Sequence, residues 1–103
     1  MNEIVTRRSA ELAALCAKHR VTRLAVFGSA ATDGFDPATS DVDFLVEFAP
    51  MSPRERADAY FGLLESLENL FGVGVDLVEP GPISNPYLRK SIEESHVVIY
   101  EAA

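Results

Sequence analysis

The chain is 103 residues long and has 16 acidic against 9 basic side chains, which gives it a net charge of −7. Its length allows one hydrophobic core, and no apolar run reaches the ~20 residues of a membrane span, so we expect a single domain over residues 1–103 with no membrane partner. The acidic middle, residues 30–85, disfavours direct binding of nucleic acid, and a lone Cys16 that cannot form an internal disulfide is consistent with a cytoplasmic protein.

The spacing of apolar residues predicts helices and strands that alternate along the chain. A first helix is expected from Glu3 to His19, with Cys16 on its apolar side. Short apolar runs and amphipathic segments then predict strands over 22–27, 41–48, 75–78 and 97–100 and helices over 53–71 and 85–95.

The helix over 53–71 begins at a capping box, because Ser52 and Glu55 have the required spacing and Pro53 stands at the first helical position. Its apolar stripe is expected to pack on the sheet and comprises Ala57, Tyr60, Phe61, Leu64, Leu67, Leu70 and Phe71. The order of elements predicts an α/β fold with a small mixed sheet and helices packed mainly on one face.

A Gly28-Ser29 turn follows the first predicted strand. Glycine lets the backbone come close to a ligand, and backbone N–H groups and a hydroxyl at such a turn suit phosphate oxygens. We therefore expect Gly28 and Ser29 to bind the phosphates of a nucleotide.

Two carboxylates open the second predicted strand. Side chains alternate along a strand, so Asp41 and Asp43 are expected on one face, with Val42 pointing away. Carboxylates held this close repel each other unless a cation lies between them. Mg²⁺ prefers such oxygen ligands together with the phosphates of a nucleotide, so the pair predicts a metal site.

Asp76 is a third acid, in the otherwise apolar strand over 75–78, after a turn bracketed by Gly72 and Gly74. If this strand lies beside that of Asp41 and Asp43, the three carboxylates converge. Such a set can hold a pair of cations and can orient or deprotonate an attacking hydroxyl.

At these residues the chain resembles the nucleotidyltransferase superfamily that includes the palm of DNA polymerase beta. It resembles more closely the minimal nucleotidyltransferases that serve as antitoxins to HEPN-domain ribonuclease toxins. The shared pattern is a Gly-Ser pair, a spacer, Asp-x-Asp and a later Asp on a neighbouring strand. Here the pattern corresponds to Gly28, Ser29, Asp41, Asp43 and Asp76, and the resemblance extends over nearly the whole chain.

This resemblance implies a polymerase beta-like nucleotidyltransferase fold and transfer of AMP from ATP to a hydroxyl group. It implies that Asp41, Asp43 and Asp76 are the catalytic and Mg²⁺-binding residues and that Gly28 and Ser29 bind ATP. The implied acceptor is a tyrosine of a partner HEPN toxin, whose ribonuclease activity the modification silences. A homo- or hetero-oligomer is compatible with this role.

The chain departs from the pattern after the Gly-Ser pair. Close relatives usually continue Gly-Ser-x-Ala-Arg-Gly, whereas Thr32 stands here at the arginine position. Arg54, Arg56 and Arg89 are the candidates to supply the missing cation.

Two alternatives remain open at this stage. A non-catalytic antitoxin that neutralises the toxin by binding is favoured by Thr32 and disfavoured by the three retained acids. A small-molecule nucleotidyltransferase of the antibiotic-modifying kind normally has a further helical domain for its acceptor, for which 103 residues leave little room.

Overall fold

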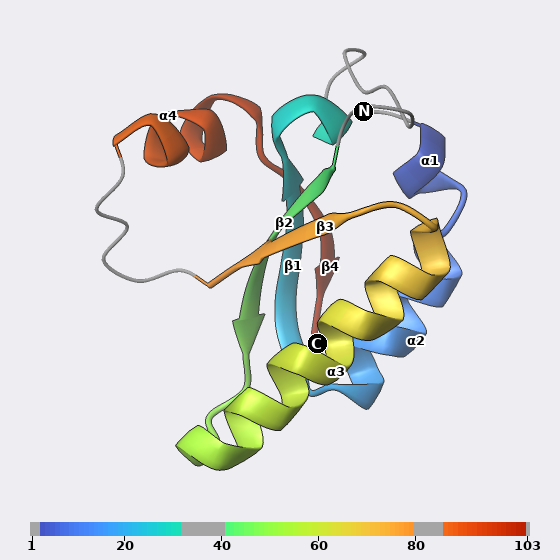
Figure 1. Ribbon diagram of the computed structural model, residues 1–103, viewed down its shortest axis with the longest axis vertical. Coiled ribbons are helices and arrows are strands. Elements are labelled where there is room, and N and C mark those ends of the chain that lie inside the picture. Colours follow the sequence, from blue (N-terminus) through green and yellow to red (C-terminus); the bar gives the residue numbers. More distant parts are fainter. Residues whose placement is uncertain (1–2, 32–40, 80–85, 103) are drawn as a thin grey trace.

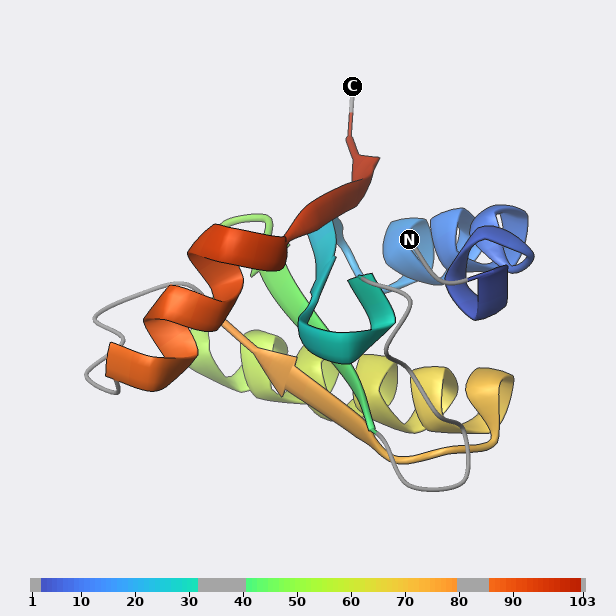
Figure 2. The ribbon, with the colours of Figure 1, turned by 90° about the horizontal axis from the view of Figure 1, so that it is seen from above.

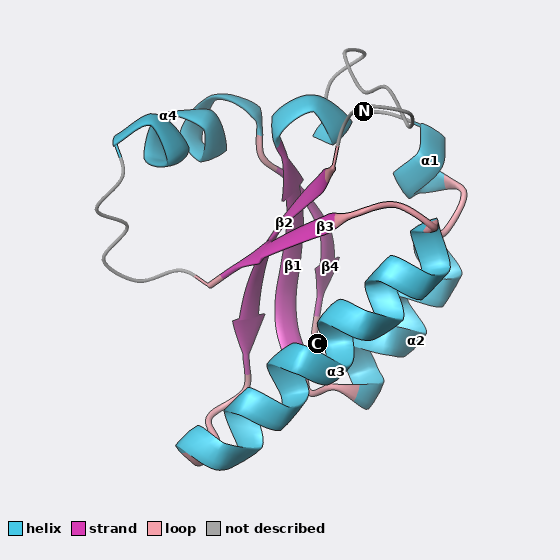
Figure 3. Cartoon of the chain, in the orientation of Figure 1, coloured by secondary structure: helices cyan, strands magenta, loops and turns pink. Residues whose placement is uncertain are grey.

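The computed structural model describes residues 3–31, 41–79 and 86–102, which form helices and strands that alternate along most of the chain (Figures 1 and 3). In chain order the elements are α1 (Glu3–Thr6), α2 (Ser9–Lys18), β1 (Val21–Phe27), the 3-10 helix η1 (Gly28–Ala31), β2 (Val42–Phe48), α3 (Pro53–Phe71), β3 (Val75–Val78), α4 (Pro86–Ser95) and β4 (Val97–Glu101).

The four strands form one mixed sheet in the order β3-β2-β1-β4. β1 is antiparallel to both β2 and β4, whereas β2 and β3 run parallel. The start of β2 therefore lies beside the end of β1 and beside the start of β3. All four strands predicted from the sequence are present, although β2 begins at Val42, one residue after Asp41.

The core lies between the sheet and the helices α2 and α3, which pack side by side (Figure 2). Phe44 of β2 is fully buried, and its ring lies 5.8 Å from that of Phe71 at the end of α3. Leu12 and Cys16 of α2 are also buried. The helix α4 lies apart from α2 and contacts η1 and β1 (Figures 1 and 2). The predicted α/β fold with a small mixed sheet is confirmed.

Two details of the predicted helices are wrong. The first helix is interrupted, because turn conformation at residues 7 and 8 separates α1 from α2. On α3, Phe61 is 65% exposed, and Leu63 is buried in its place. The face that packs on the sheet is set by Leu63 and Leu67, four residues apart, and Phe61 lies outside it.

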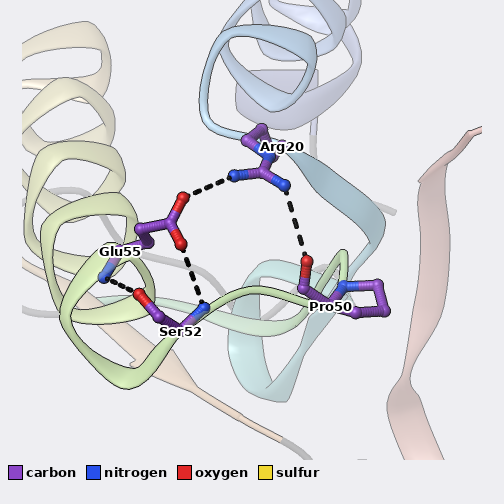
Figure 4. Close-up of polar contacts among 4 residues, drawn as sticks. All are labelled: Arg20, Pro50, Ser52 and Glu55. Atoms are coloured by element: carbon purple, nitrogen blue, oxygen red, sulfur yellow. Dashed lines mark hydrogen bonds and ion pairs between the residues drawn. The ribbon is translucent and has the colours of Figure 1, made fainter.

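The chain enters α3 through the predicted capping box, which is tied to Arg20 in the turn between α2 and β1 (Figure 4). The Glu55 backbone N–H donates to the Ser52 hydroxyl, and the Ser52 backbone N–H donates to the Glu55 carboxylate, each at 3.2 Å. Arg20 donates to Glu55 at 3.2 Å and to the Pro50 carbonyl at 3.5 Å. The bonds from Ser52, and then the Arg20 guanidinium, lower the pKa of Glu55. These contacts fix the connection between β2 and α3.

In the described ranges, none of the helices has both the length and the apolarity needed to cross a bilayer.

Candidate active site

The end of β1 brings the backbone of Gly28 against the carboxylate of Asp43. Phe27, the last residue of β1, pairs with Asp43 of β2. Gly28 then turns into η1 with φ at +69°, in the left-handed region that residues with a Cβ rarely adopt. A Cβ at this position would lie 2.5 Å from Asp43 Oδ2. Glycine is therefore required both by the backbone conformation and by the space that the carboxylate occupies.

Asp43 and Asp76 lie opposite each other on the parallel strands β2 and β3. Asp43 is partly buried, whereas Asp76 is exposed. Burial, the negative charge of Asp76, a hydrogen bond with the Asp76 side chain and the charge of Asp41 together raise the pKa of Asp43 from 3.8 to about 6. The neighbouring negative charges thus favour the protonated form of Asp43 and repel its ionised form.

Asp41 directly precedes β2, and its side chain is exposed. The backbone next to it is fixed by Val42, whose N–H donates to the Gly74 carbonyl at 3.0 Å. The Asp41 carboxylate extends over Gly74, because a Cβ built there would lie 2.5 Å from Asp41 Oδ1. Sequence reasoning interpreted Gly74 only as a turn residue, and nothing in its spacing signals this contact.

The remaining predicted site residues are less closely tied to this cluster. Ser29 belongs to η1, but its side chain lies outside the described residues, as does the whole of Thr32. Of the three candidate arginines, Arg56 pairs with Glu79 at 2.9 Å rather than with one of the three carboxylates. Arg54 and Arg89 are exposed, in α3 and α4.

The carboxylates fit a divalent cation by the type of donor they offer. Within residues 3–31, 41–79 and 86–102, no three His, Cys, Asp or Glu side chains lie close enough together to hold a metal ion by themselves. The charges of Asp76 and Asp41 nevertheless raise the pKa of Asp43, and a cation bound beside these carboxylates would offset their mutual repulsion. Mg²⁺ is usually bound by one or two carboxylates, with substrate phosphates and water as the other ligands. The acids therefore fit Mg²⁺ when a nucleotide supplies further oxygens.

The raised pKa of Asp43 predicts how the stability of the metal-free protein depends on pH. Between about pH 4 and pH 6 the folded state holds this proton more tightly than the unfolded chain, so the stabilisation is present at low pH and is lost as the pH rises. Asn at position 43 has no carboxyl group to titrate, so the stability of Asp43→Asn does not fall with rising pH for this reason. We expect the free energies of unfolding of wild type and Asp43→Asn, measured in EDTA by urea titration, to diverge over this interval in favour of the variant. A constant difference from pH 4 to pH 7 would contradict the prediction.

Comparisons with known proteins show which family the chain belongs to. The nucleotidyltransferase domain model matches residues 11–99. A Methanocaldococcus jannaschii protein, provisionally named a protein adenylyltransferase, is 40% identical over 82 residues, which cover 80% of each chain. A solved structure described, also provisionally, as a minimal nucleotidyltransferase is 32% identical, has a TM-score of 0.63 and covers 94% of this chain and 95% of that one. A solved toxin–antitoxin structure with AMP-PNP is 18% identical and shares the fold, with a TM-score of 0.67 over 91% of this chain and 73% of that one.

Proposed function

The chain belongs to the nucleotidyltransferase domain family, and from this membership we propose that it transfers AMP from ATP to a hydroxyl group of a partner protein. The observation that carries the proposal is the meeting of Asp43, Asp76 and the backbone of Gly28 at one end of the sheet. In the reaction the acceptor oxygen forms a bond to the α-phosphorus of ATP, and the bond from that phosphorus to pyrophosphate breaks.

Each residue of the site has a proposed role. Asp41, Asp43 and Asp76 would hold Mg²⁺, which neutralises charge on the triphosphate and the leaving pyrophosphate when it is bound. Gly28 lets the backbone come close to the phosphates at the end of β1, and Ser29 donates to them. Asp76, which is exposed, orients the acceptor hydroxyl and receives its proton.

The proposed acceptor is a tyrosine of a HEPN-family ribonuclease toxin, and the modification would make this chain the antitoxin. Two similarities support a protein acceptor and a toxin partner. The relative from Methanocaldococcus jannaschii is named for adenylyl transfer to protein, and the neighbour solved with AMP-PNP is a toxin–antitoxin structure. Because an acidic surface repels a free triphosphate, we also propose that ATP binds together with its cation.

Position-specific labelling of ATP tests the transfer. We expect label from α-phosphate ATP to become attached to a HEPN-family ribonuclease when the protein and Mg²⁺ are present. Label from γ-phosphate ATP should appear in pyrophosphate and not on the ribonuclease. Attachment of the γ-label would indicate a kinase and would contradict the proposal, as would the absence of both labels from a ribonuclease that the protein binds and inhibits.

A further inference from the structure

The carboxylate of Asp41 occupies the space that a side chain at position 74 would fill. An ideal Cβ on Gly74 would lie 2.5 Å from Asp41 Oδ1, 3.0 Å from Cγ and 3.5 Å from Oδ2. All three distances involve the carboxylate group, so its whole end rests over the glycine. Position 74 lies in the link between α3 and β3, far from Asp41 along the chain.

Within the described residues, no hydrogen bond or ion pair holds the Asp41 carboxylate. Its neighbour Val42 is anchored, because the Val42 N–H donates to the Gly74 carbonyl at 3.0 Å. The same glycine thus fixes the backbone beside Asp41 and leaves the space in which its carboxylate lies. Asp43 differs, since it lies within β2, directly opposite Asp76 of β3 and beside Gly28.

We propose that Gly74 is a positioning residue, which keeps the Asp41 carboxylate on the side of Asp43 and Asp76 by having no side chain of its own. The inference rests on the proposed function, because the position of Asp41 matters only if it is a metal ligand. A Cβ at position 74 displaces the carboxylate, which is the flexible end of an exposed side chain. The displacement therefore changes the site and leaves the fold unchanged.

Gly74→Ala tests this proposal, with Gly72→Ala as the matched control in the same connection. Gly72 has φ at +69°, and among the described residues none beyond its chain neighbours places an atom within 4 Å of its ideal Cβ, so alanine there strains the backbone without crowding a side chain. Gly74 lies outside the left-handed region, so alanine there crowds Asp41 without that strain. Comparing the two variants therefore distinguishes the effect of moving the Asp41 carboxylate from the effect of destabilising the connection between α3 and β3.

The readouts are the affinity of the nucleotide-free protein for Mn²⁺, measured by titration calorimetry, and the thermal midpoint. Gly74→Ala should bind Mn²⁺ about tenfold more weakly, as do changes that misorient a metal ligand, at an unchanged midpoint. Gly72→Ala should lower the midpoint and keep the wild-type affinity. Asp41→Ala/Gly74→Ala should bind Mn²⁺ no more weakly than Asp41→Ala alone, because the added methyl group then has no carboxylate to displace.

The outcomes separate this inference from the proposed function. Wild-type affinity in Gly74→Ala would overturn the role of Gly74 and leave the proposed function standing. A midpoint in Gly74→Ala as low as that of Gly72→Ala would show backbone damage and would also overturn the role. A wild-type protein that binds no Mn²⁺ without a nucleotide would overturn the role of Gly74 and leave the proposed function standing, because there the cation arrives together with ATP.

Discussion

Asp43→Asn is expected to lower the rate of AMP transfer by about 10³-fold, a typical effect of removing one group that acts directly at a reacting centre. Asn has the shape of Asp but lacks the negative charge that a cation requires. The fold should survive, because the ionised Asp43 carboxylate repels Asp76 and Asp41 rather than stabilising the core. The variant should therefore be inactive and, at neutral pH without metal, more stable than wild type.

The measurement is the steady-state rate of pyrophosphate release, with a thermal melt of each variant. Asp58→Asn is the matched control, because Asp58 is an exposed acid on α3 and its substitution changes the net charge by the same amount. Asp41→Ala should also abolish transfer. Full activity in both Asp43→Asn and Asp41→Ala would show that these carboxylates do not hold the metal.

Gly28→Ala is expected to lose both stability and transfer. An alanine at φ +69° costs about 1–2 kcal/mol of unfolding free energy, since its Cβ crowds the following carbonyl. Its Cβ would also lie 2.5 Å from Asp43 Oδ2, so the carboxylate must leave the position in which it faces Asp76. Transfer should then fall by an amount approaching that of Asp43→Asn.

Gly72→Ala separates these two effects, because Gly72 has the same φ of +69° and open space around its Cβ. Urea unfolding should show a loss of about 1–2 kcal/mol in both variants, while transfer falls only in Gly28→Ala. Equal transfer rates in the two variants, measured below their unfolding range, would show that contact with Asp43 has no part in catalysis.

The strands, and the face of β2 on which Asp43 lies, can be predicted from the alternation of apolar and polar residues along the chain. Val42 and Phe44 alternate with Asp43, so a strand that buries the first two must turn the acid the other way. The capping box at Ser52 and Glu55 is equally local, because it depends on four consecutive residues. The predicted site required the strand of Asp76 to lie beside that of Asp41 and Asp43. The parallel pairing of β2 with β3 fulfils this condition.

What the sequence could not predict depends on contacts between distant segments. The apolar stripe on α3 has several compatible orientations, and only packing on the sheet buries Leu63 and leaves Phe61 exposed. The contact of Gly74 with Asp41 likewise requires that β3 start beside β2. The pKa of Asp43 could not be read from the chain either, since it depends on burial and on Asp76 of another strand.

The most direct test of the account is the intact mass of a HEPN-family ribonuclease after incubation with this protein, ATP and Mg²⁺. The account predicts that the ribonuclease gains one or more AMP units and that Asp43→Asn leaves its mass unchanged. A stable complex of the two proteins in which the ribonuclease keeps its original mass would contradict the account and would indicate an antitoxin that acts by binding alone.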